Sequence, residues 1–212
     1  MIVLALDTCL GACSVAVIDG ERTLASATEA MTRGHQERLA PMTGEVMIAA
    51  GLAFSDLDRI GVTVGPGSFT GLRVGLAFAK GLALALDLPC IGVGSLEALA
   101  GSVGDTGHCA AVIDAGRGNV YLQQFDRARA TSGPDVMAME TAAARLVEAH
   151  DLGGVTLVGP SAAVLMAVSV EAPQAVLTSP DPATVAALAA RAPITPPRPL
   201  YLRPPDAKLK AT

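Results

Sequence analysis

The segment LALDTCLGACSVAV, residues 4–17, decides the fold class of this chain of 212 residues. It reads as an apolar strand that ends at Asp7, a tight turn at Gly11, and a second apolar strand that returns antiparallel to the first. The segment AVIDAGRGNVYLQQ, residues 111–124, repeats this order and aligns Asp114 with Asp7 and Gly118 with Gly11. The offset of about half the chain indicates an internal duplication.

Strands and helices are predicted outward from the two hairpins by the spacing of apolar residues. The first half is expected to add a strand over 23–28, a helix from 35, a strand over 59–64, a helix over 70–86, a strand over 91–93 and a helix that Ser95 caps. The second half is expected to add a helix over 141–150, a strand over 155–158 and a helix over 182–191.

This pattern predicts that the chain is divided into three parts. We expect an N-terminal lobe over 1–105, a smaller C-terminal lobe over 106–192 and an extended Pro-rich tail over 193–212, anchored by Tyr201 and Leu202. Two lobes on duplicated mixed β-sheets flanked by helices are typical of the actin-like ATPase (ASKHA) fold, an α/β class shared by sugar kinases and heat-shock chaperones.

The composition argues against a protein that binds nucleic acid by itself and against a membrane protein. The formal net charge is -5, whereas a protein that grips nucleic acid by itself needs clustered Lys and Arg. The 4 Cys have no regular spacing and no basic region precedes an apolar run at the amino terminus. We also expect no apolar stretch of about 18 residues. These features predict a cytoplasmic protein without a membrane segment.

The longest glycine motif is GPGSFTGLRVG, residues 65–75, between a predicted strand and a predicted helix. Such a loop can present backbone N–H groups to an anion, but its spacing departs from both the Walker A and the Rossmann patterns. In the alternative interpretation, which we favour, the loop is structural: its glycines permit a tight turn and Ser68 or Thr70 caps the helix. The loop residues are Gly65, Pro66, Gly67, Ser68 and Phe69.

Small residues recur at every fourth position of the helix after this loop, namely Gly71, Gly75, Ala79 and Ala83. We expect this face to let the helix of a partner approach closely, so that a charged residue at Gly75 or Ala79 would abolish pairing without unfolding the lobe. Burial inside the chain's own lobe is the alternative. Arg73, Lys80 and Asp87 form a narrow charged stripe on the same helix.

Six segments occur in one order along nearly the whole chain: LALDTC (4–9), GHQERLAPM (34–42), GPGSFTGLRVG (65–75), GSLEALA (94–100), DAGRGNVY (114–121) and PLYLRPPDAK (199–208). Together they resemble the TsaB family, also called YeaZ. The glycine motif is the most distinctive of them, because a match of that length in one order is rare by chance.

The resemblance implies a non-catalytic subunit without a cofactor that binds and activates a TsaD homologue in making N6-threonylcarbamoyladenosine at position 37 of tRNA. It also implies a TsaE-type ATPase in the assembled complex, contact with tRNA only through the complex, and a homodimer in isolation. The helices that begin near 35 and near 70 would make the contact with TsaD or with a second copy. Their candidate residues are His35, Leu39, Met42 and Val46 on the first helix and Thr70, Gly71, Arg73, Gly75, Ala79, Lys80 and Ala83 on the second.

Asp7 and Asp114 stand where an actin-like ATPase would hold its metal and its attacking water. An Asp at a strand end can bind magnesium through water, but it also commonly accepts a hydrogen bond from its own turn, which is the role we favour. The two positions are therefore treated as a degenerate nucleotide cleft. A self-sufficient kinase or ATPase of the same fold is the second hypothesis for function.

Metal chemistry has little support in the sequence. The catalytic relative TsaD carries two His four residues apart on one helix, whereas here His35 is followed at position 39 by Leu. His108 and His150 are expected to have surface roles, and the Cys residues are expected to be packing thiols. A metalloprotease therefore ranks third among the hypotheses.

Overall fold

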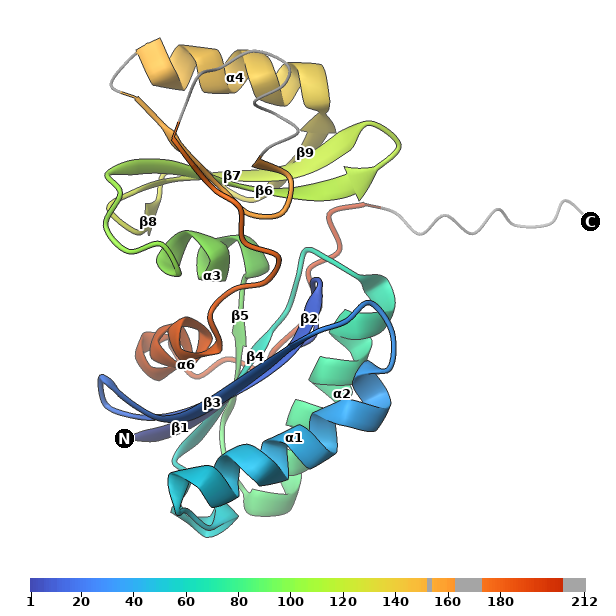
Figure 1. The fold of residues 1–212 in the computed structure, drawn as a ribbon, viewed down its shortest axis with the longest axis vertical. Coiled ribbons are helices and arrows are strands. Elements are labelled where there is room, and N and C mark those ends of the chain that lie inside the picture. The colour runs from blue at the N-terminus through green and yellow to red at the C-terminus, as the bar shows by residue number, and fades with distance from the viewer. Residues whose placement is uncertain (152–153, 163–172, 204–212) are drawn as a thin grey trace, which may run out of the picture.

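The computed structural model describes residues 1–151, 154–162 and 173–203, which form two lobes, each built on one β-sheet (Figure 1). The first sheet has the order β3-β2-β1-β4-β5 and contains β1 (Ile2–Asp7), β2 (Ala12–Asp19), β3 (Arg22–Ala30), β4 (Arg59–Thr63) and β5 (Cys90–Val93). β1, β2 and β3 pair antiparallel, whereas β4 and β5 continue parallel to β1. The three opening strands predicted from the sequence are confirmed.

The second sheet repeats this topology. Its order is β11-β10-β6-β7-β8 with β9 also paired to β7, and its strands are β6 (His108–Gly116), β7 (Asn119–Asp126), β8 (Arg129–Ala130), β9 (Asp135–Ala138), β10 (Thr156–Val158) and β11 (Gln174–Ala175). β6 pairs antiparallel with β7, as β1 does with β2, and β10 and β11 continue parallel to β6, as β4 and β5 do to β1. The duplicated mixed sheets are therefore confirmed.

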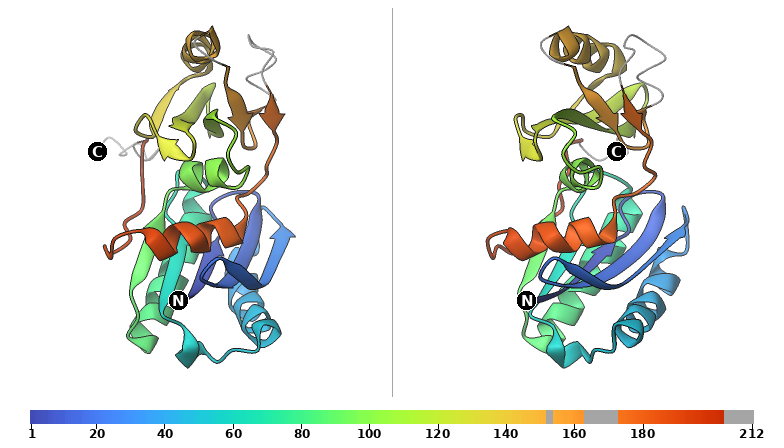
Figure 2. Two further views of the ribbon diagram at one scale, coloured as in Figure 1. Left: turned by 90° about the vertical axis from the view of Figure 1, so that its left-hand side faces the viewer. Right: turned by 60° about the vertical axis from the view of Figure 1, so that its left-hand side comes forward.

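Helices cover the first sheet on both faces. The elements are α1 (His35–Ala50), the short 3-10 helix η1 (Phe54–Asp56), α2 (Phe69–Leu86) and α6 (Pro182–Arg191). Leu4 and Leu6 of β1 pack with α1 and α2, whereas Val3 and Ala5 pack with α6. Because side chains alternate along a strand, a strand covered on both faces must be apolar throughout. Figures 1 and 2 show the resulting three layers.

The two lobes exchange helices across their boundary. α3 (Ser95–Gly101), which follows β5, places Leu96 and Leu99 against Ile113 and Phe125 of the second sheet. In return, α6 follows β11 and packs on β1, β2 and β4 of the first sheet. α4 (Met139–Asp151) stays with the second sheet. The packing units therefore differ from the expected ranges 1–105 and 106–192, because α3 and α6 each bury their apolar face in the opposite lobe.

The structure tests two predicted helix caps and the predicted lack of helix in the Pro-rich tail. Ser68 caps α2, since its Oγ accepts a hydrogen bond from the Gly71 N–H at 3.2 Å, so that prediction is confirmed. The prediction for Ser95 is wrong, because α3 begins at this residue and Gly94 holds the cap position without a side-chain hydrogen bond. Residues 193–203 contain no helix, as their prolines predict, and 204–212 of the tail lie outside the described residues.

One helix contradicts an expectation from composition. α2 has 18 residues with a mean hydropathy of 1.4, so by length and composition it could cross a membrane. In the structure, Leu72, Leu76 and Ala79 of this helix are buried in the core of the first lobe. A core helix meets the same criterion, because one broad face of it is apolar for packing.

Candidate functional site

The glycine motif connects β4 to α2 and is held by backbone hydrogen bonds on both sides. The Ser68 N–H donates to the Cys9 carbonyl at 2.7 Å, and the Ser95 N–H donates to the Gly65 carbonyl at 2.9 Å. Gly65 has φ 95°, a conformation that L side chains rarely adopt. The loop is thus tied to the turn between β1 and β2 and to the start of α3.

Close approach explains the other glycines of the motif. A Cβ on Gly67 would overlap the Cys9 carbonyl, and a Cβ on Gly71 would overlap the Thr8 carbonyl. The Thr8 hydroxyl donates to the Gly71 carbonyl at 2.7 Å and lies 2.5 Å from where a Cβ on Gly75 would be. These glycines let α2 lie directly on the β1–β2 turn, in agreement with the structural interpretation of the loop.

The small-residue face of α2 is turned into its own lobe. Gly71, Gly75, Ala79 and Ala83 are all buried there. The expectation that this face is open to a partner helix is therefore wrong: small side chains serve the close approach of α2 to its own hairpin turn and sheet. A charged residue at Gly75 or Ala79 would disrupt the lobe itself.

The candidate residues of α1 are buried in the same core. His35, Leu39, Met42 and Val46 are between 0% and 7% exposed. They face the first sheet because they share the helical stripe that packs on it. Among the candidate residues on these two helices, only Thr70, Arg73 and Lys80 are exposed. A partner that binds α1 and α2 would therefore contact the opposite faces of these helices.

Those opposite faces carry exposed apolar side chains, of which only Phe69, in the glycine loop, was named from the sequence. Ile48 on α1 is 82% exposed, Leu84 on α2 is 86% exposed, and Phe69 at the start of α2 is 50% exposed. A shallow groove of about 470 Å³ between the helices is lined by Gln36, Phe69, Thr70, Arg73, Val74, Ala77 and Phe78. We call the surface formed by Ile48, Leu84 and these groove residues the α1–α2 outer face.

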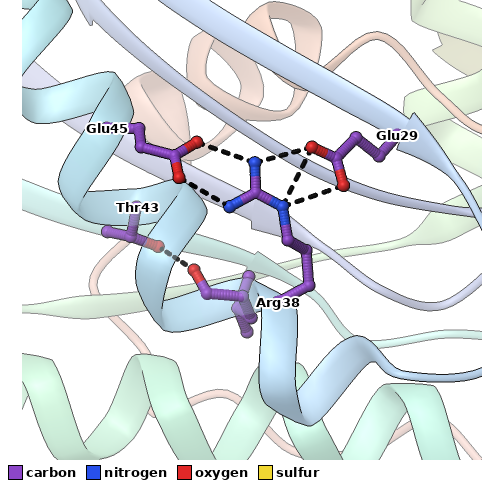
Figure 3. Close-up of polar contacts among 5 residues, drawn as sticks. Glu29, Arg38, Thr43 and Glu45 are labelled. Atoms are coloured by element: carbon purple, nitrogen blue, oxygen red, sulfur yellow. Dashed lines mark hydrogen bonds and ion pairs between the residues drawn. The ribbon is translucent and has the colours of Figure 1, made fainter.

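One arginine joins α1 to the first sheet through ion pairs (Figure 3). Arg38 Nη2 lies 2.6 Å from Glu29 of β3 and 2.7 Å from Glu45 of α1. The hydrogen bonds that Arg38 donates to Glu29 and then to Glu45 raise the pKa of its guanidinium, and the same bonds lower the pKa of both carboxyls. Within the helix, the Thr43 hydroxyl donates to the Leu39 carbonyl at 2.8 Å. Arg38 therefore fastens α1 to the edge strand of the first sheet.

A cleft of about 610 Å³ lies between the lobes, where the two duplicated hairpin turns face each other. It is lined by Gly11, Gly67, Asp114 and Ser161 among others. Asp114 Oδ1 accepts the Gly116 N–H at 2.7 Å, two residues on. Asp7 does the same with the Cys9 N–H at 3.0 Å. The turn role favoured for both aspartates is confirmed.

Asp7 differs from Asp114 because it is completely buried. Its Oδ1 also accepts the Thr63 hydroxyl at 2.6 Å, whereas its Oδ2 has no hydrogen-bond partner within the described part of the chain. His35 Nε2, which is also buried, has none there either. Burial raises the pKa of the Asp7 carboxyl, although bonds from Thr63 and Cys9 and the proximity of His35 act in the opposite direction.

Asp7→Asn is expected to stabilise the protein near neutral pH by about 1 kcal/mol or more, since an ionised carboxylate is removed from the core while the Oδ1 acceptor remains. A carboxyl with a raised folded-state pKa favours folding below its unfolded-state value of 3.8, and this contribution is lost as the pH rises through the folded-state pKa. The variant should therefore lose less stability as the pH rises. Urea unfolding of both proteins, measured at pH values from below the unfolded-state pKa up to neutral pH, tests this expectation.

The matched control is Asp114→Asn, which alters an exposed carboxylate with the same turn bond. It should change the stability at neutral pH by much less than Asp7→Asn, because the Asp114 side chain is solvated. Destabilisation by Asp7→Asn at all pH values would show that the charge of Asp7 is needed in the core.

The cysteine thiols and His108 have the surroundings expected of packing and surface residues. Burial raises the pKa of the Cys9 thiol to about 12 and that of Cys13 to about 11, which fits packing thiols. His108 is exposed and lies 3.7 Å from Asp126, as expected of a surface residue, whereas the side chain of His150 lies outside the described residues. No group of three or more potential metal ligands occurs in the described ranges.

Known proteins share this sequence and this arrangement. The model of the family described as "TsaD: tRNA N6-adenosine threonylcarbamoyltransferase" matches residues 23–190. The Escherichia coli tRNA threonylcarbamoyladenosine biosynthesis protein TsaB is 38% identical over 130 residues, which are 60% of this chain and 56% of that protein. YeaZ from Pseudomonas aeruginosa superposes with a TM-score of 0.81 at 29% identity, covering 95% of this chain and 99% of that one. The chain is a TsaB (YeaZ) member of this family.

The likeness to known proteins extends over nearly the whole chain. An uncharacterized protein of Mycobacterium tuberculosis is 38% identical over 217 residues, 97% of this chain and 93% of that protein. The match to E. coli TsaB, in contrast, spans little more than half of that relative. A ROK hexokinase from Thermus thermophilus has a TM-score of 0.51 at 14% identity, covering 90% of this chain and 93% of that one, and so shares the fold alone. The actin-like fold expected for this TsaB chain is thereby confirmed.

Proposed function

We propose that this chain is a non-catalytic subunit in the synthesis of N6-threonylcarbamoyladenosine at position 37 of tRNA, where it binds and activates a TsaD homologue. The pathway is supported by the names of its TsaB relatives. The observation that carries the docking role is the α1–α2 outer face, on which Ile48 and Leu84 are 82% and 86% exposed. Apolar side chains so exposed on neighbouring helices are typical of a surface that a partner covers.

The partner fits this surface by helix packing. α1 and α2 begin side by side, since Gln36 and Thr70 line grooves at their shared N-terminal end. An exposed pair of helices can receive a second pair from the TsaD homologue, with side chains of one pair in the grooves of the other. The same surface would serve a second copy of this chain, so we also propose a homodimer in isolation that the TsaD homologue replaces.

The absence of catalysis by the chain alone is part of the proposal. None of the described residues lining the inter-lobe cleft is Lys or Arg, and a cleft that holds nucleotide phosphates normally supplies such charges. Asp7 and Asp114 already accept bonds from their own turns. We therefore assign the ATPase step to a TsaE-type partner and tRNA contact to the assembled complex, in the cytoplasm, without a membrane.

Co-expression with the TsaD homologue of the same source tests the proposal. The tagged chain should retain the TsaD homologue through size-exclusion chromatography as a stoichiometric complex. With TsaD, a TsaE-type ATPase, ATP, tRNA and an activated threonylcarbamoyl donor present, addition of the chain should be required for modification. By itself the chain should neither turn over ATP nor modify tRNA. Steady ATP hydrolysis by the purified chain that Asp7→Ala removes would instead support the kinase or ATPase hypothesis.

A further inference from the structure

The described end of the chain returns from α6 across the first lobe. Pro197 is buried against β5, where a Cβ on Gly92 would lie 3.2 Å from it. The Leu200 N–H donates to the Val64 carbonyl at 2.8 Å, immediately before the glycine loop. Residues 197–200 are thereby anchored beside the point where β4 leads into α2.

The next residue reaches the α1–α2 outer face. The Tyr201 ring centroid lies 5.6 Å from that of Phe69, and the Tyr201 hydroxyl accepts the Arg73 Nε–H at 3.3 Å. Arg73 in turn places its guanidinium 3.8 Å from the centroid of the Phe69 ring. These three side chains form one exposed cluster, because Phe69 and Tyr201 remain 50% and 48% exposed. Aromatic and arginine side chains are the types most often found as binding hot spots.

Two residues further on, the chain touches the other lobe. Arg203 Nη1 donates to the Ala115 carbonyl at 2.6 Å, near the end of β6 and just before the β6–β7 turn. Its guanidinium lies against Gly116, where a Cβ would come within 3.7 Å. A charged donor on a carbonyl makes a stronger bond than a neutral pair. Four residues thus connect the first sheet, the outer face and the second hairpin.

This connection lies apart from the other crossings between the lobes. In Figure 1 the exchanged helices α3 and α6 lie on the left-hand side of the molecule, whereas the red segment before the grey trace passes from one lobe to the other on the right. Crossings on one side alone leave two lobes free to rotate about them as a hinge. A contact on the other side limits that rotation.

We propose that residues 200–203 form a strap that makes the shape of the docking surface depend on how the two lobes are arranged. With the strap in place, Arg203 holds the β6–β7 turn near the first lobe, and Tyr201 holds Phe69 and Arg73 in one arrangement. A partner that covers the Phe69, Arg73 and Tyr201 cluster therefore binds one inter-lobe arrangement more tightly than others. This coupling rests on the proposed docking function, but the strap itself does not.

Hydrogen exchange on the full-length free protein tests the strap. Arg203→Ala should increase amide exchange in residues 114–121 by about tenfold, the change expected when a charged hydrogen bond is lost. Arg203→Lys keeps a donor and should restore part of the protection. Arg198→Ala is the matched control, because Arg198 is an exposed arginine of the same tail. Equal exchange in the Arg203→Ala and Arg198→Ala proteins would overturn the strap.

Affinity for the TsaD homologue tests the coupling. Arg203→Ala should weaken binding several-fold although Arg203 contacts the other lobe, and Tyr201→Ala should weaken it more than Tyr201→Phe, which keeps the ring. Faster exchange with unchanged affinity would overturn the coupling and leave the docking role intact. If the unmodified chain does not bind the TsaD homologue, the proposed function and the coupling both fail, whereas the exchange result still decides on the strap.

Discussion

Gly71→Ala is expected to lower the free energy of unfolding by about 3 kcal/mol. The new methyl group would overlap the Thr8 carbonyl oxygen, which is backbone and cannot rotate away. The Thr8 hydroxyl also donates to the Gly71 carbonyl at 2.7 Å, so a shift of α2 that relieved the overlap would break a buried bond. Urea unfolding monitored by circular dichroism measures the loss.

Gly81→Ala in the same helix is the matched control. A Cβ at Gly81 meets no atom within 4 Å, and the residue is exposed. In a helix interior Ala is favoured over Gly by roughly 0.5 to 1 kcal/mol, so this variant should be more stable than the parent protein. Stabilisation by both substitutions would contradict the contact between α2 and the β1–β2 turn.

Ile48→Glu and Leu84→Glu are each expected to weaken binding of the TsaD homologue by about 30-fold, the effect of losing one hot spot. A charge at either position would be desolvated when a partner covers the α1–α2 outer face. Both side chains are more than 80% exposed in the free protein. The melting temperatures of the two variants should therefore stay close to that of the parent protein. Isothermal titration calorimetry and thermal unfolding give the two readouts.

Val176→Glu supplies the control for a charge placed on exposed apolar surface elsewhere. Val176 is 54% exposed and follows β11 in the second sheet. The Val176→Glu variant should leave the affinity for the TsaD homologue unchanged. Equal loss of binding in all three variants would mean that added negative charge, and not the outer face, controls association. Normal binding by the Ile48 and Leu84 variants would place the docking surface elsewhere.

The fold could be predicted in large part because its signals are local. Asp7 ends β1, Asp114 lies two residues before the end of β6, and each accepts a hydrogen bond from the amide two residues on, so the same short pattern marked both hairpins. The sequence limited the cap of α2 to Ser68 or Thr70, and the structure shows that it is Ser68. The cap at Ser95 was wrong because serine also occupies the first helical turn, and the residue type alone does not distinguish the two positions.

The candidate docking residues are where prediction from the sequence failed. It selected mainly the buried stripe of α1 and of α2, from His35 to Val46 and from Gly71 to Ala83. A stripe of small residues indicates close approach to some helix or sheet without saying which one. Ile48 and Leu84 lie off that stripe, and the exposed position of a single apolar residue has no signal in composition or spacing.

By itself, the sequence determined two duplicated hairpin units, the order of strands and helices in each half, and a start for α2, because hydrogen bonds within a few residues of each other specify these features. Only the tertiary structure decided that α3 and α6 change lobes, that the glycines of α2 lie on Thr8, and that Arg203 reaches the Ala115 carbonyl. Each of these joins segments far apart in the chain. Such contacts depend on how whole apolar faces are buried against one another, which no local pattern encodes.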